Sequence, residues 1–140
     1  MTAFLLSVHV IAAILTVGPV AVAASMFPPT ARATPDGPLP RGLHRISRVY
    51  ALIGIIVPVF GIATGAALGV LGDAWLIVSL ALTALAAALL IWGILPAQAA
   101  VLAGESRPRL AMTTGLFNLL WAIVVVLMIV RPGSTTGAGL

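Results

Sequence analysis

Four long apolar runs, separated by shorter polar segments, dominate the amino-acid sequence. Each run has at least the roughly 20 residues that an α-helix needs to cross a hydrocarbon core of about 30 Å. Helices are expected because a helix satisfies its own backbone hydrogen bonds in lipid. The sequence therefore predicts an all-α polytopic membrane protein, an antiparallel bundle of four transmembrane helices. The spans cover about residues 4–27, 49–71, 74–95 and 111–130.

The segments between the runs are predicted as connections. Residues 28–48, rich in proline, glycine and arginine, indicate a first loop, and residues 96–110 a third. The second and third spans are joined by a tight turn at Gly72-Asp73. Two long helices with so short a link must form an antiparallel hairpin.

The chain is predicted to hold a single transmembrane domain, residues 1–133, followed by a disordered tail, residues 134–140. The first span also has a feature of a signal peptide, because Ala21-Val22-Ala23 resembles a cleavage site. It lacks a basic start, however, and its apolar stretch is longer than a signal peptide needs. We therefore expect the first helix to be retained.

Composition agrees with a lipid-facing surface. Apolar residues make up 61% of the chain and charged residues 7%, against about 45–50% and about 25% in soluble domains. All seven basic residues are arginine, and there is no cysteine. The sequence contains no basic stripe with interleaved aromatic residues, so no nucleic-acid partner is expected.

The arginines predict the orientation in the membrane. Six lie in the first and third loops, and Arg131 alone lies on the other side. By the positive-inside rule, we expect a plasma-membrane protein with both termini external and the loops 28–48 and 96–110 cytoplasmic. The six are Arg32, Arg41, Arg45, Arg48, Arg107 and Arg109.

Small residues indicate how the first two spans pack. Gly61, Gly65 and Gly69 recur at four-residue spacing and would form one packing ridge. The alternative is that glycine is simply common in membrane helices. The first span offers a face of residues for this ridge, namely His9, Ala12 or Ala13, Thr16 and Ala23.

Two prolines interrupt these same spans. Pro19 and Pro58 each remove a backbone donor, which frees the carbonyls of Leu15 and Gly54. Two kinks at one depth either open a pocket or are tolerated bends, with threonine or serine hydroxyls near the freed groups.

His9 is the only histidine, and the only residue among Asp, Glu, Lys, Arg and His, within the predicted spans. Such a residue is a functional-site hypothesis by default. Three roles remain open for it: an interhelical hydrogen bond, a haem ligand, or a proton relay or other metal ligand. Asn118, in the middle of the fourth span, is expected to make an interhelical hydrogen bond.

The segment LLSVHVIAAILTVG, residues 5–18, resembles the first helix of a group of four-helix bacterial membrane proteins. The resemblance extends to the basic stretch 43–48, to Trp75 at the start of the third span, and to Arg131-Pro132 after the fourth. The group includes an uncharacterised actinobacterial integral membrane family, the CopD-like copper-resistance domain and the HemJ-type protoporphyrinogen oxidase.

The resemblance implies a cofactor. In the HemJ-type oxidase the first-helix histidine is associated with haem b, a role that would fall on His9 as the iron ligand. That family has a lysine where this chain has Ser79, which argues against the oxidase activity. A second axial ligand would have to come from another residue, and Met128 is the candidate. The alternative for Met128 is ordinary apolar packing.

A basic cluster opens the second span, and we interpret it as a lipid or anion contact. It lies at the opposite membrane face from His9, so its histidine cannot partner His9 in one chain. The cluster is Arg41, His44, Arg45 and Arg48.

No acidic residue lies in any span, and no catalytic residue is predicted. Three hypotheses remain: a haem-binding protein for haem handling or electron transfer, a non-catalytic subunit or scaffold of a larger membrane complex, and a small transporter or channel. Expected partners are membrane lipids and either a second copy or another membrane protein.

Overall fold

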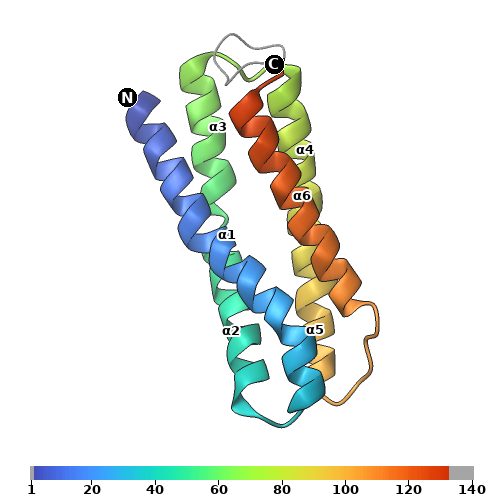
Figure 1. Ribbon diagram of the computed structural model, residues 1–140. Helices are drawn as coiled ribbons and strands as arrows, with labels where there is room; N and C mark the ends of the chain where they lie inside the picture. Colours follow the sequence, from blue (N-terminus) through green and yellow to red (C-terminus); the bar gives the residue numbers. More distant parts are fainter. Residues whose placement is uncertain (1, 133–140) are drawn as a thin grey trace.

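The computed structural model describes residues 2–132, and the regular structure of this part is entirely helical. Four helical segments are long and apolar enough to cross a membrane, which confirms that part of the predicted fold. In Figure 1 they form an elongated bundle, with the start of α1 and the end of α6 at the same end. The elements are α1 (Thr2–Ala33), α2 (Pro38–Ile53), α3 (Ile56–Leu68), α4 (Ala74–Ala88), the π-helix η1 (Leu89–Ile94), α5 (Leu95–Leu102) and α6 (Leu110–Val130).

The helices extend well beyond the predicted spans. Most of segment 28–48, predicted as a loop, is helical, because α1 continues to Ala33 and α2 begins at Pro38. Proline fits the first turn of a helix, where its missing N–H would have no partner. The arginines of α2 lie on its exposed side, while its other side buries Leu43, His44 and Ser47. The basic segment is therefore an amphipathic helical extension. The predicted tail, residues 134–140, lies outside the described residues.

Pro58 and Pro96 are accommodated differently. Pro58 lies in the first turn of α3, just after the break between α2 and α3, and the Gly54 carbonyl accepts a hydrogen bond from the Val57 N–H at 3.0 Å. Pro96, predicted to end the third span, lies in the first turn of α5, directly after η1. A π-turn shifts the backbone pairing, so the helix passes the proline instead of stopping.

The larger cluster of buried apolar residues lies toward the end of the bundle that carries the arginines of α2, called the basic end below. Phe27, Ile94 and Phe117 lie at its centre and are almost fully buried. A separate small cluster, Val70, Trp75 and Leu76, closes the other end. Between the two clusters lies a cavity that is described below.

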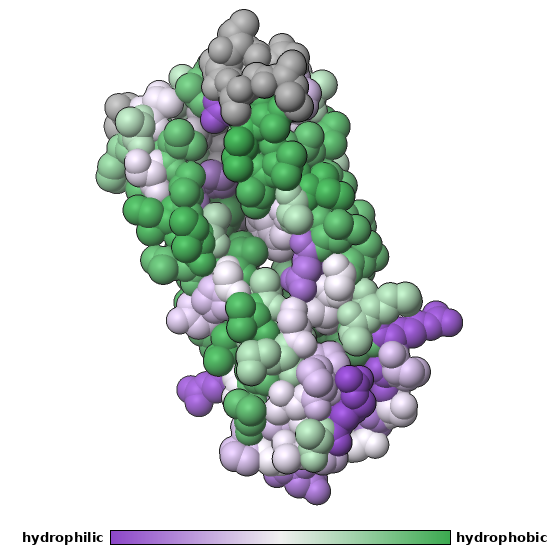
Figure 2. Space-filling view, in the orientation of Figure 1, coloured by the Kyte–Doolittle hydropathy of each residue, from purple (hydrophilic) through white to green (hydrophobic). Residues whose placement is uncertain are grey.

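The outer surface of the bundle is apolar. Figure 2 shows hydrophobic side chains over most of the length of the molecule, and polar ones gathered at the end that holds α2 and α5. Large apolar side chains are exposed, including Trp92 at 76% and Leu52 at 71%. A soluble monomer rarely exposes so continuous an apolar surface.

Candidate functional site

The His9 side chain points from α1 to the backbone of α3. Its Nδ1 lies 2.8 Å from the carbonyl oxygen of Val57. A carbonyl oxygen only accepts, so Nδ1 carries the hydrogen and donates it. In the neutral ring the other nitrogen, Nε2, therefore holds a lone pair. Histidines that bind metals are commonly oriented by this kind of hydrogen bond.

Gly61, one turn beyond Val57 on α3, provides the space for this ring. A Cβ atom on Gly61 would lie 2.9 Å from Cε1 of His9 and 3.2 Å from Nδ1. The absence of a side chain there lets the imidazole reach the α3 backbone. Of the three predicted packing glycines, this one contacts α1 as expected.

The other two glycines have different roles. A Cβ on Gly65 would lie 2.8 Å from Leu76 Cδ2, at the start of α4, and 3.1 Å from Leu71 Cδ2. Gly69 has a φ of 72° and caps the C-terminus of α3. The three glycines therefore do not form one ridge against α1, because α3 ends just where the third would be needed.

His9 and Met128 line the same cavity, which has a volume of about 520 Å³. It lies between α1, α3, α4 and α6, and its walls are mainly apolar. Met128 also packs against the Val70, Trp75 and Leu76 cluster, so it approaches from the α4 and α6 side. The two residues proposed as axial ligands thus come from different helix pairs. Other lining residues include Leu6, Ala13, Leu80, Thr83, Val124 and Arg131.

Arg131 ties the end of α6 to the start of α4. Its Nε donates to the Met128 carbonyl at 3.1 Å, and its guanidinium lies 5.2 Å from the centroid of the Trp75 ring. Trp75 Nε1 in turn donates to Asp73 Oδ2 at 3.1 Å. The sequence analysis used Arg131 for membrane orientation and for the resemblance, and it missed Arg131 as a lining residue. Arg131 follows the last residue of α6 and lies three residues after Met128, and this short separation was the available signal.

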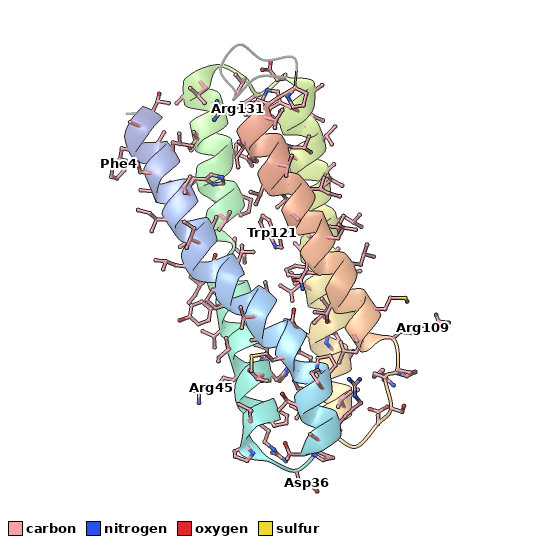
Figure 3. All side chains as sticks on the ribbon, in the orientation of Figure 1. Phe4, Asp36, Arg45, Arg109, Trp121 and Arg131 are labelled. Carbon is pink, nitrogen blue, oxygen red and sulfur yellow. The ribbon has the colours of Figure 1, made fainter. Side chains whose placement is uncertain are left out.

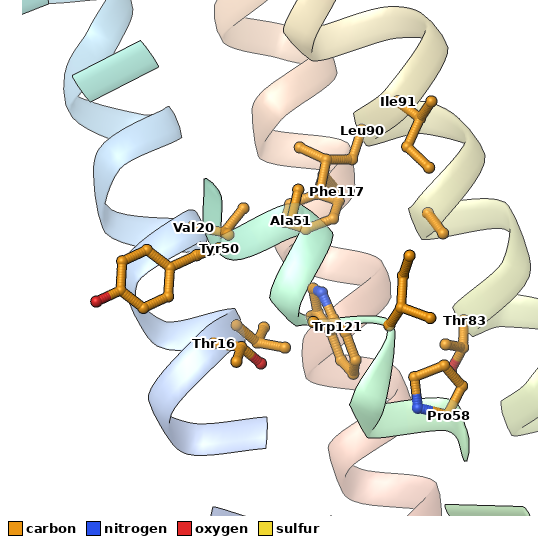
Figure 4. Close-up of a pocket in the computed structure, with 14 residues that line it drawn as sticks. Thr16, Val20, Tyr50, Ala51, Pro58, Thr83, Leu90, Ile91, Phe117 and Trp121 are labelled. Carbon is orange, nitrogen blue, oxygen red and sulfur yellow. The ribbon is translucent and has the colours of Figure 1, made fainter. Parts of the chain in front are cut away.

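A smaller cavity of about 110 Å³ lies next to the first, nearer the middle of the bundle. Figure 4 shows Trp121, Thr16 and Pro58 around it. Trp121, Pro58 and Thr83 line both cavities. Of the two predicted proline kinks, only the one in the second span therefore borders this space.

The predicted basic cluster lines a third cavity, at the opposite end from His9. Arg41, Arg45 and Arg48 are exposed there, whereas His44 is only 9% exposed. His44 Nδ1 donates to Oε1 of Gln98 on α5 at 2.8 Å, and Gln98 is fully buried. The sequence pattern missed Gln98, because a lone glutamine after a proline gave no sign of a histidine partner.

Asn118 makes the predicted interhelical hydrogen bond. Its Nδ2 donates to Ser25 Oγ at 2.8 Å, which joins α6 to α1. Ser79, which stands where the resembling oxidase has lysine, is buried, and its hydroxyl donates to the Trp75 carbonyl within α4. Ser79 therefore makes a hydrogen bond within its own helix.

Comparison of the chain with protein-family models, with curated proteins and with solved structures found no match.

Proposed function

We propose that this chain is a multi-pass protein of the plasma membrane that binds haem b through His9. Its four spans form an antiparallel bundle, both termini are external, and the end of the bundle that carries six of the seven arginines is cytoplasmic. The charge distribution supports this orientation: in Figure 3, Arg45 and Arg109 lie toward one end of the bundle and Arg131 lies at the other.

The observation that carries the haem proposal is the hydrogen bond from His9 Nδ1 to the Val57 carbonyl. It fixes the tautomer in which Nε2 is the free donor atom, and it holds the ring at the wall of an apolar cavity. A histidine that served only to join two helices would need no cavity beside it. Of the residues in that cavity, His9 and Met128 carry the donor atoms that haem iron takes from proteins.

The cavity suits an apolar, carboxylate-bearing cofactor in its other features. Trp121 and Val124 provide apolar surface for a flat macrocycle, and Arg131 supplies positive charge for its acidic substituents. Bound haem would supply one-electron redox chemistry. The chain's own contribution is to orient His9 through Val57 and Gly61, to provide Met128 as the second donor, and to exclude water.

The proposal is tested by the visible spectrum of the protein purified in detergent after haem supplementation. The wild type should show a Soret band at about one haem per chain, and His9→Ala should abolish it. Met128→Leu, which keeps the apolar volume, should leave haem bound but change its spin state or lower its reduction potential.

His44 provides the matched control, because it is the only other histidine and lies at the opposite end of the bundle. His44→Gln should retain the Soret band. A wild-type protein that shows no Soret band after supplementation would overturn the proposal. A band that persists unchanged in His9→Ala would equally remove His9 as the ligand.

A further inference from the structure

The third cavity, lined by the basic cluster, is a groove of about 680 Å³ between α2 and the segment formed by η1 and α5. It is separate from the cavity around His9 and shares none of its lining residues. Its walls are Arg41, His44, Arg45, Arg48, Val49, Ala51, Leu52 and Ile55 on one side and Ile91, Leu95 and Leu102 on the other.

Polarity changes along this groove in one direction. The arginines come first on α2, followed by Val49 and Leu52, and Ile55, just after the end of α2, lies nearest the middle of the bundle. Residues 41–55 correspond to roughly 20 Å of helix rise. The groove is therefore cationic at the end of the bundle and apolar in its depth, which is the polarity of a phospholipid lying along a membrane protein.

The positive charge of the groove is concentrated on one helix face. Arg41, Arg45 and Arg48 are spaced by four and three residues, so they lie on the same side of α2. Among residues 2–132, no carboxylate lines the groove. The described ion pair at this end, between Arg107 and Glu105, lies outside it. The three guanidinium groups thus present uncompensated positive charge where phosphates lie in a bilayer.

The basic part of the groove includes a buried, hydrogen-bonded side chain as well as exposed arginines. His44 lines it between the arginines, and its hydrogen bond to the fully buried Gln98 fixes the ring against α5. Ser47, fully buried on the same helix, donates to the Leu43 carbonyl. The bond between His44 and Gln98 joins α2 to α5, and so sets the distance between the arginines and the opposite wall, while the Ser47 bond lies within α2.

The apolar depth of the groove is open sideways. Leu52 is 71% exposed and Ile55 55% exposed. Ile91, on the opposite wall, belongs to η1, and π-helical turns often occur at functional sites. An acyl chain can therefore enter from the surrounding lipid without any helix moving.

We infer that this groove binds one phospholipid with an anionic headgroup, taken from the leaflet at the basic end of the bundle. Its phosphate lies among Arg41, Arg45 and Arg48, and one acyl chain lies along Ile55, Ile91 and Leu95. The inference does not depend on haem binding, because the two sites have no lining residue in common.

Native mass spectrometry of the detergent-solubilised protein tests the inference, with phosphatidylglycerol and phosphatidylcholine of the same acyl chains as probes. We expect one phosphatidylglycerol to be retained and phosphatidylcholine to bind at least tenfold more weakly. Each of Arg41→Gln, Arg45→Gln and Arg48→Gln should weaken phosphatidylglycerol about fivefold. Arg109→Gln is the matched control, since it removes one exposed charge outside the groove, and it should change nothing.

Two further experiments distinguish a bound phospholipid from other possible occupants of the groove. Ile91→Trp, which narrows the apolar wall without changing charge, should also weaken phosphatidylglycerol. Glycerol phosphate, which has the headgroup chemistry but no acyl chain, should not displace the lipid at equal concentration. Displacement by glycerol phosphate would show a free-anion site instead and overturn the inference. Equal retention of phosphatidylcholine would overturn it too, as would a loss for Arg109→Gln as large as for the groove variants.

Discussion

The imidazole of His9 lies directly against the backbone of Gly61, with Cε1 2.9 Å from the point where a side chain on Gly61 would begin. The same ring donates to the carbonyl of Val57, four residues earlier on α3. One turn of α3 therefore provides both the acceptor for the histidine and the space that it occupies. A substitution at Gly61 should therefore displace the His9 ring while leaving the imidazole itself unchanged.

Gly61→Ala is predicted to destabilise the bundle locally. The alanine gains about 1 kcal/mol of helix propensity, but its methyl group displaces the His9 ring, and crowding of this kind costs about 1–3 kcal/mol. Gly115→Ala is the control, because a Cβ there meets nothing within 4 Å. Unfolding in detergent should show Gly61→Ala to be about 1–3 kcal/mol less stable than Gly115→Ala. Equal stability of the two variants would mean that the ring is not held at this contact.

The buried pair His44 and Gln98 predicts a non-additive pair of substitutions. His44→Leu leaves both polar atoms of the Gln98 amide buried without a partner, at a cost of about 1–3 kcal/mol. Gln98→Leu should cost less, because it also removes an Nε2 that has no partner in the structure. The double variant should be more stable than the sum of the two losses predicts, since no polar atom of the pair is left buried. Additive losses in a thermal double-mutant cycle would show that the 2.8 Å contact contributes nothing.

The sequence predicted the four apolar helical segments because hydropathy integrates over about 20 residues and tolerates local errors. It also singled out His9 by its ionisable character and Met128 as the candidate for a second haem ligand, and both residues line one cavity. The interhelical hydrogen bond of Asn118 was predicted because an unpaired amide in lipid is costly.

Features decided by the neighbouring helix could not be predicted in this way. The role of Gly65 depends on Leu76 at the start of α4, and no spacing within the second span reveals that contact. Pro96 suggested a helix end, yet η1 lets the backbone pass it. The proline and arginine content of segment 28–48 suggested a loop, because its buried side is visible only once α2 packs on α1 and α5.

The hydrogen bond between Asn118 and Ser25 predicts a small, specific loss. Ser25→Ala removes the acceptor of a 2.8 Å bond between α6 and α1, and such bonds contribute about 0.6 kcal/mol on average in membrane bundles. Ser7→Ala is the matched control, since its hydroxyl bonds only to Ala3 within the same helix. Repeated unfolding measurements should resolve a loss of about 0.6 kcal/mol for Ser25→Ala and none for Ser7→Ala. Identical unfolding free energies for the two variants would show that the interhelical bond does not contribute to stability.

The proposed orientation predicts a definite pattern of chemical labelling. The chain has no cysteine, so each introduced cysteine is the only thiol present. Asp36, Ser106 and Gly72 are exposed and lie in the three connections between the apolar helical segments. A membrane-impermeant thiol reagent should label Gly72→Cys in intact cells. It should label Asp36→Cys and Ser106→Cys only after the membrane is permeabilised.

The proposed orientation rests on the distribution of the arginines, so substituting them tests it. Replacing the six arginines at the basic end of the bundle changes the charge distribution from six against one to none against one, and so removes the bias that sets the proposed orientation. A variant with glutamine at these positions should insert in both orientations and label Gly72→Cys only in part of the population. Labelling of Asp36→Cys from outside intact cells, with the arginines unchanged, would reverse the proposed topology and place the cavity around His9 on the cytoplasmic side.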